Sequence, residues 1–127
     1  MNKIILVLVL MILGHLIADY VLQGWLGNAK QKSWWEKVAP SPLYKYDYVI
    51  ALICHCAMWT IITLAPILYF SYENLNWFWL MIPANILFHY VVDDLKANKQ
   101  KINLITDQAL HLIQIILTWL LWVLFIN

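Results

Sequence analysis

Three histidine–aspartate pairs stand out in this chain because the members of each pair are four residues apart. The pairs are His15 with Asp19, His89 with Asp93, and Asp107 with His111. Residues four apart lie on one face of an α-helix, so each pair can present an imidazole and a carboxylate to the same point. Imidazole nitrogens and carboxylate oxygens together suit zinc, iron or manganese. The spacing therefore predicts metal ligation.

The segments that carry these pairs are strongly apolar. Of 127 residues, 64% are hydrophobic and 12% are charged, whereas a soluble domain has about 25% charged residues. Eight tryptophans and seven tyrosines are typical of chains whose aromatic rings line a membrane boundary. About 20 apolar residues cross a bilayer, and four segments reach this length: 4–26, 46–70, 77–95 and 104–126. We expect an all-α, four-transmembrane-helix bundle in which residues 1–127 form a single transmembrane domain.

The distribution of lysine indicates the orientation of this bundle. Seven of the eight lysines fall in the first and third connectors: Lys30, Lys32, Lys37, Lys45, Lys96, Lys99 and Lys101. Basic connectors stay in the cytoplasm. Four spans then place both termini outside.

The order of residues within each pair follows this topology. The first and third spans run inward and read His then Asp, whereas the fourth runs outward and reads Asp then His. Every aspartate is therefore expected on the cytoplasmic side of its histidine. The sequence predicts a layer of aspartates near the cytoplasmic boundary and a layer of histidines one turn deeper.

Carboxylates at this depth need compensation. Each costs about 2.5–3.5 kcal/mol at the centre of a membrane helix, and Lys96 is the one lysine expected within reach. A divalent cation would neutralise the carboxylates and use the imidazoles. The candidate metal ligands, one histidine from each span included, are His15, Asp19, His55, His89, Asp93, Asp107 and His111. Seven ligands exceed what one tetrahedral ion uses, so two metals bridged by a carboxylate are plausible.

Other polar residues lie near the ligands. Five of them could orient the ligands by hydrogen bonds: Gln23, Asn85, Asp94, Gln108 and Gln114. The alternative for these residues is ordinary hydrogen bonding between membrane helices.

The sequence also resembles a family of small bacterial and phage membrane proteins that is classed as a domain of unknown function. The resemblance rests on "GHLIADYVLQGWLGNAK", "HYVVDDLK" and "DQALHL". It implies the four-span fold and a site at the family's signature positions, which here are His15, Asp19, Gln23, Lys30, His89, Asp93, Lys96, Asp107, Gln108 and His111. The chain departs from the family in its long connector with tryptophans and prolines and in having Asp94. The expected location is the bacterial inner membrane, or a host membrane for a phage-encoded protein.

The leading functional hypothesis is a membrane metalloenzyme. Its divalent metal, either zinc, iron or manganese, would activate water for hydrolysis of a lipid or lipid-linked substrate. The candidates for catalysis are Asp19, Asp93, Asp107 and Lys96; Lys30 or Lys96 could bind a phosphate. The alternatives are divalent-ion or proton transport or sensing, and a membrane effector whose polar core only fixes the fold. Haem ligation is disfavoured by the carboxylate beside each paired histidine.

The expected partners follow from the same composition. Membrane lipids are expected at the apolar surface, and a homo-oligomer or another membrane protein is left open. A net charge of +1 provides no large basic surface, so no nucleic acid is expected.

Overall fold

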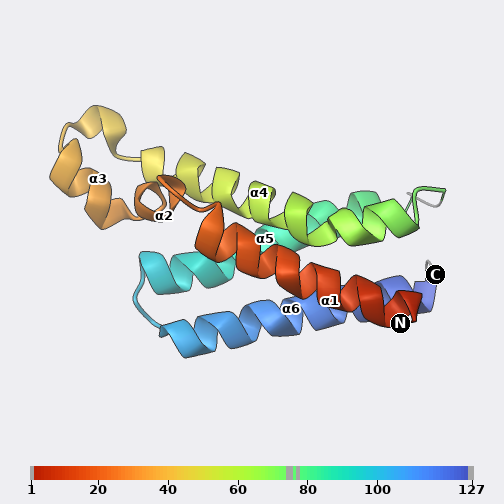
Figure 1. Cartoon of the computed structure of the whole chain (residues 1–127). Helices are drawn as coiled ribbons and strands as arrows, with labels where there is room; N and C mark the ends of the chain where they lie inside the picture. The colour runs from red at the N-terminus through yellow and green to blue at the C-terminus, as the bar shows by residue number, and fades with distance from the viewer. Residues whose placement is uncertain (1, 74–75, 77, 126–127) are drawn as a thin grey trace.

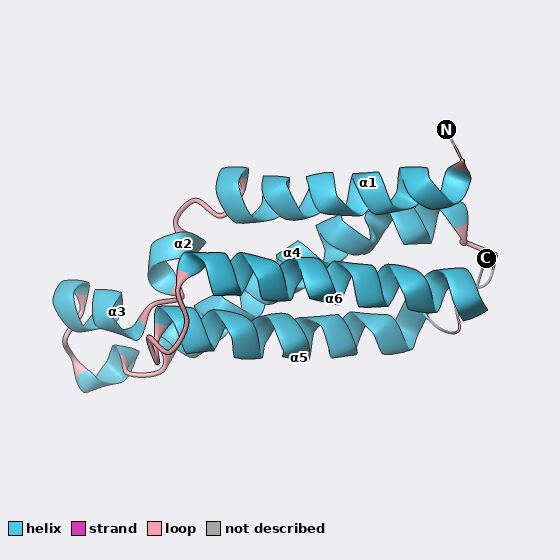
Figure 2. Cartoon of the chain, turned by 90° about the horizontal axis from the view of Figure 1, so that it is seen from below, coloured by secondary structure: helices cyan, strands magenta, loops and turns pink. Residues whose placement is uncertain are grey.

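Four long helices pack side by side and antiparallel in the computed structural model, which describes residues 2–73, 76 and 78–125 (Figures 1 and 2). Helix α1 packs against α4 and α6, and α5 also packs against α4 and α6, so the four helices form a closed ring. No strand occurs among the described residues. The long helices are α1 (Lys3–Leu16), α4 (Asp47–Phe70), α5 (Phe78–Ala97) and α6 (Leu104–Phe125).

Most connecting structure lies at one end of the bundle, and the chain termini lie at the other (Figure 1). The π-helical turn η1 extends α1, and the chain then reverses through two short helices and a 3-10 turn before α4 begins. These elements are η1 (Ile17–Val21), α2 (Leu26–Ala29), α3 (Lys32–Val38) and η2 (Pro42–Tyr44). We call residues 22–46 the first connector.

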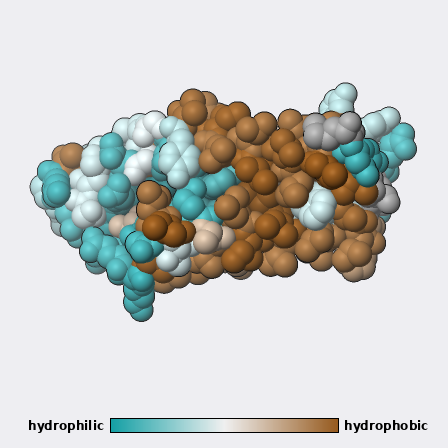
Figure 3. Space-filling view, turned by 60° about the horizontal axis from the view of Figure 1, so that its bottom comes forward, coloured by the Kyte–Doolittle hydropathy of each residue, from teal (hydrophilic) through white to brown (hydrophobic). Residues whose placement is uncertain are grey.

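On the face drawn in Figure 3, the surface of the bundle is mostly apolar, and the hydrophilic surface gathers mainly at the connector end, with a smaller hydrophilic area at the opposite end. Val21 is 70% exposed, Ile105 80% and Leu124 71%. Within the described ranges, three helical segments are long and apolar enough to cross a membrane: Lys3–Val21, Pro42–Phe70 and Leu104–Phe125.

Helix α5 is 20 residues long and is more polar than the other long helices. It carries Asn85 and His89 as well as Asp93 and Asp94 near its end. Its crossing of the membrane, and with it the four-span count and the outside location of the termini, stays a prediction.

The interior is divided along the bundle axis. Apolar side chains packed around Trp59 and Trp122, which are both completely buried, fill most of the half nearer the termini. A small hydrogen-bonded group of Asn85, Gln114 and Thr118 is also buried there. The half nearer the connectors contains the buried aspartates and histidines. Apolar residues face outward and polar residues face inward, which is the pattern expected of a helix bundle surrounded by lipid.

Close packing of α1 on α4 depends on Gly14. A Cβ atom at this position would lie 3.0 Å from the Ile62 carbonyl oxygen and 3.3 Å from the Thr63 Cα atom. Both atoms belong to the backbone, so neither can rotate away. Small residues allow this approach between helices where lipid supplies no hydrophobic driving force.

Gly14→Ala is therefore expected to destabilise the bundle by about 1–3 kcal/mol, because α1 must move away from α4. Thermal unfolding in detergent, followed by circular dichroism, measures this change. Leu13→Ala is the matched control, since Leu13 is 47% exposed on the same helix. Equal unfolding temperatures for the two variants would show that the α1–α4 contact is not tight.

Candidate metal centre

Each of the four long helices contributes one histidine to a buried layer. His15, His55, His89 and His111 are at most 1% exposed. The ring centroids of His55 and His89 are 5.2 Å apart, those of His89 and His111 are 4.2 Å apart, and those of His15 and His111 are 5.7 Å apart. The predicted layer of histidines is thus a continuous group of rings in the structure.

The carboxylate of Asp93 lies among three of these rings. Its Oδ1 atom is 3.2 Å from His111 Nε2 and 3.7 Å from His89 Nε2. Its Oδ2 atom is 3.2 Å from His55 Nε2. Three imidazoles from three helices therefore direct the same ring nitrogen toward one carboxylate.

Asp19 approaches the same place from η1. Its Oδ1 atom is 3.5 Å from His55 Nε2, which itself lies 3.3 Å from His89 Nε2. Two overlapping groups have ligand atoms within 4.8 Å of one another and could hold a metal ion; one is Asp19, His55 and His89, and the other is His89, Asp93 and His111. We call these five residues the His/Asp cluster.

The cluster contains buried polar atoms that have no hydrogen-bond partner within the described part of the chain. They include Asp19 Oδ1 and the Nδ1 atoms of His55, His89 and His111. A buried carboxylate oxygen without a donor is costly, and a cation next to it would relieve that cost. The donor set and the unpaired Asp19 oxygen both fit a divalent metal.

His15 has a different environment from the other histidines. Trp59 Nε1 donates a hydrogen bond to His15 Nδ1 at 2.9 Å. An indole nitrogen can only donate, so Nδ1 accepts and the proton of a neutral ring is on Nε2. His15 Nε2 then donates to Gln108 Oε1 at 3.1 Å, and Gln108 Nε2 donates to Asp107 Oδ2 at 3.0 Å.

His15 and Asp107 therefore form a hydrogen-bonded chain beside the cluster. Neither residue belongs to the two groups that could hold a metal. Both still contact the cluster: His15 Nδ1 is 3.5 Å from Asp19 Oδ2, and Asp107 Oδ1 is 3.4 Å from His111 Nε2. Direct ligation by these two residues stays a prediction.

Two lysines reach the buried aspartates. Lys30 Nζ is 2.6 Å from Asp93 Oδ2 and 3.2 Å from His55 Nε2, and Lys96 Nζ is 2.7 Å from Asp107 Oδ2. The expectation that Lys96 is the one lysine within reach was therefore wrong. Lys30 belongs to a connector, and the fold of that connector returns it to the bundle interior.

Local structure explains how Lys30 reaches this position. Gly24 adopts a positive φ of 44°, which glycine tolerates without strain, and α2 then packs against α4 with Ala29 buried. Asn98, after α5, holds the next residues: its Nδ2 donates to the Lys30 carbonyl at 3.2 Å, and its Oδ1 accepts from Lys32 N at 2.8 Å. Ordering the first connector is thus part of building the site.

The π-helical turn η1 directs Asp19 into the cluster. Such turns occur mostly as single interruptions of an α-helix and are frequent at functional sites. The Gln23 side chain donates to the Asp19 carbonyl at 2.6 Å and so supports the turn. Gln23 therefore acts on the backbone that carries Asp19.

The other predicted polar residues lie around the cluster. Asp94 is turned away from it, toward Asn98 Nδ2 at 3.0 Å and Lys99 Nζ at 2.9 Å. One turn before His89, Asn85 accepts a hydrogen bond from Gln114 at 2.8 Å through its Oδ1 atom. Gln108 links His15 to Asp107, whereas Asp94, Asn85 and Gln114 are hydrogen-bonded outside the cluster.

Trp59 is a site residue that the sequence reasoning missed. Its ring stacks on His89 with centroids 4.2 Å apart and an interplanar angle of 27°, while its Nε1 atom fixes His15. The sequence did contain a signal for Trp59: it lies in the middle of the predicted span 46–70, away from the membrane boundary where tryptophan usually serves as an anchor.

Two cavities reach the aspartate side of the cluster. Their volumes are about 360 and 230 Å³. Four side chains line both cavities: Gln23, Lys30, Asp93 and Lys96. No histidine lines either cavity within the described ranges, which agrees with histidines that lie deeper than the aspartates.

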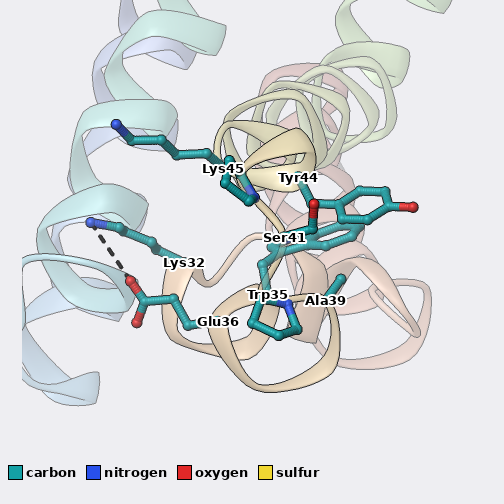
Figure 4. A pocket seen from close by; sticks show the side chains of 9 residues that line it. Lys32, Trp35, Glu36, Ala39, Ser41, Tyr44 and Lys45 are labelled. Carbon is teal, nitrogen blue, oxygen red and sulfur yellow. Dashed lines mark ion pairs between the residues drawn. The ribbon is translucent and has the colours of Figure 1, made fainter.

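Another pocket, of about 330 Å³, lies in the first connector and contains no cluster residue (Figure 4). Trp35 and Tyr44 form one side with stacked rings, and Lys32 pairs with Glu36 at 3.8 Å on the other. We assign the candidate site to the His/Asp cluster, because this pocket is formed by connector residues that carry no set of metal ligands.

The fold and the site define an all-helical, apolar bundle with a buried His/Asp cluster that could hold a metal ion. The chain belongs to the family described as "Protein of unknown function (DUF3307)", whose model matches residues 7–127. No curated protein and no solved structure matches the chain.

The Asn98 contacts predict that one side chain orders the first connector. Asn98→Ala removes both hydrogen bonds to the Lys30–Lys32 segment, so amide hydrogens in residues 25–38 are expected to exchange faster. Hydrogen–deuterium exchange with mass spectrometry measures this. Asn28→Ala, at an exposed position of the same connector, is the control, and unchanged exchange in Asn98→Ala would contradict the assigned role.

Proposed function

We propose that this protein is a multi-pass membrane metalloprotein whose His/Asp cluster binds one or two divalent ions near the cytoplasmic side. The basic connectors lie at the cluster end of the bundle, which supports a cytoplasmic location for that end. The four spans and the outside termini belong to this proposal. Zinc, iron and manganese all suit the donors.

One observation carries the proposal: three imidazole Nε2 atoms from different helices meet the Asp93 and Asp19 carboxylates within the two groups that could hold a metal. His89 is common to both groups, so two ions would share this part of the site. In this assignment His55, His89, His111, Asp19 and Asp93 are the ligands, and His15 and Asp107 support them from the side.

The reaction that the site supports best is hydrolysis of a lipid or lipid-linked substrate. A divalent ion supplies an activated water and a Lewis acid when it is bound. Asp19 lines a cavity and has an unpaired Oδ1 atom, so it is the carboxylate best placed to accept a proton. Asp107 also has an unpaired Oδ1 atom, but it lines neither cavity, and its Oδ2 atom accepts from Lys96 and Gln108, which favours a structural role for it.

Transport or sensing is a second candidate because polar residues continue beyond the cluster. Gln114 and Thr118 both donate to Asn85 Oδ1, at 2.8 and 3.1 Å. However, a pathway toward the termini would have to pass Trp59 and Trp122, which are completely buried in the apolar core. We therefore place hydrolysis first.

Protein purified without exposure to a chelator is expected to contain stoichiometric metal by elemental analysis. His89→Gln should lose most of it, because His89 belongs to both groups. His15→Gln is the matched control and should retain metal, since both nitrogens of His15 already have protein partners. Wild-type protein that contains no metal and takes up none would overturn the proposal.

Metal-loaded protein in lipid nanodiscs is expected to release product from a phosphoester or carboxylic ester lipid. Asp19→Asn should reduce the rate at least about 100-fold, the usual contribution of a general base, while the group of His89, Asp93 and His111, which does not include Asp19, keeps its ion. Mass spectrometry of extracted lipids follows the reaction. Stoichiometric metal without turnover, together with ion flux into proteoliposomes that His55→Ala abolishes, would favour transport instead.

A further inference from the structure

We propose that Lys30 and Lys96 form a phosphate-binding site that becomes available when metal binds, so that the substrate is a phosphate ester. This inference rests on the proposed metal centre and names the chemistry of its ligand. Lys30 would exchange the Asp93 carboxylate for the phosphate of the substrate, and Lys96, which lines the same cavities, would bind the phosphate from beside Asp107.

The cavities have the side chains that an anion requires. Lys30 and Lys96 line both of them, and their side chains are 12% and 36% exposed. The amides of Gln23, Gln31 and Gln100 line the larger cavity. Gln23 and Gln31 each donate one N–H to a backbone carbonyl and retain a second N–H as a neutral donor. The carboxylates among the described lining residues are Asp19 and Asp93, which are the ones that a metal would occupy.

Lys30 is bound to an oxygen that metal binding would claim. Lys30 Nζ lies 2.6 Å from Asp93 Oδ2, and that same oxygen is 3.2 Å from His55 Nε2. A cation between the imidazoles and Asp93 competes with the ammonium group for this carboxylate. The Lys30 ammonium is carried on a flexible four-carbon chain, so it can move away from Asp93 without a change in the backbone. The adjoining cavity has room for it.

The net charge within the site also indicates that an anion binds after the metal. Three buried aspartates, Asp19, Asp93 and Asp107, exceed the two lysines by one charge when the histidines are neutral. A single divalent ion reverses the sign of that excess. With neutral histidines, the metal-free site therefore disfavours an anion, whereas the metal-loaded site attracts one.

A phosphate is the anion that this arrangement fits. Two ammonium groups and several amide donors can each address a different oxygen of a tetrahedral group. The smaller cavity is also bordered by Tyr20 and Leu104, which are 59% and 54% exposed on the apolar surface. A phosphate carried by a lipid could enter there from the side, and free phosphate could enter from the connector end.

The test measures metal and phosphate separately on the full chain in detergent. Metal content comes first, and calorimetry then follows binding of inorganic phosphate or of dihexanoyl phosphatidic acid, with and without zinc. We expect the phosphate compounds to bind only when zinc is present. Lys30→Gln and Lys96→Gln should each weaken it about tenfold or more, as for loss of a charge-assisted hydrogen bond.

Lys30→Gln should also bind zinc more tightly, because the competing ammonium group is gone. If Lys30 had only a structural role, its loss would not weaken phosphate binding and strengthen zinc binding at the same time. Lys32→Gln is the control, since Lys32 is exposed and pairs with Glu36. Stronger binding of the lipid than of inorganic phosphate would identify the lipid as the source, and the reverse would identify free phosphate. If metal-loaded Lys30→Gln and Lys96→Gln bind phosphate as tightly as the wild type, this proposal is overturned and the metal centre is not. Absence of metal binding would overturn the metal centre as well.

Discussion

The burial of Asp93 in an apolar bundle is the constraint on which the rest of the structure depends. This carboxylate is 3% exposed, and an ionised group without partners at such a position is strongly destabilising. Its compensation comes from His55 of α4, His111 of α6 and Lys30 of the first connector. A single charge therefore links three parts of the chain to α5. The first part of the connector serves this need, because the turn at Gly24, the packing of α2 on α4 and the Asn98 hydrogen bond bring Lys30 to the interior.

The division of the interior follows from the same constraint. The apolar surroundings inside the bundle cannot hydrogen-bond to polar groups, so the buried polar side chains must satisfy one another inside the ring of helices. Apolar packing around Trp59 and Trp122 holds the helices together in the half nearer the termini. The other half can then hold several titratable groups, some of them incompletely paired. Stability and chemistry are thus placed in different halves of one small bundle, and Trp59 connects them by packing against His89.

The sequence was sufficient to predict those features of the site that depend on helical periodicity. The four-residue spacing and the order reversed in the last pair predicted that His89, His111, Asp19 and Asp93 lie together, because both follow from helix geometry and chain direction. His55 was expected beside them only as the one histidine of the second span. The depth of Lys30 could not be predicted, since it depends on the reversal at Gly24 and on the distant side chain of Asn98. The separate role of His15 depends on the Trp59 indole, which is a contact between helices. Asp94 follows Asp93 directly and was expected to orient the ligands, but it faces Asn98 and Lys99 instead. Adjacent residues on a helix point about 100° apart.

The way in which the histidine rings are held bears on how firmly a metal would be bound. Histidines that bind metals usually donate their second ring nitrogen to an acceptor, and loss of such a partner typically weakens binding 10–100-fold. Here the Nδ1 atoms of His55, His89 and His111 have no partner among the described residues, and the rings are oriented by stacking, with centroids of Trp59 and His111 each 4.2 Å from that of His89. Stacking fixes the positions of the rings without increasing their basicity. A centre of this kind favours a metal that exchanges, which is the condition under which a nearby ammonium such as that of Lys30 can compete for the same carboxylate.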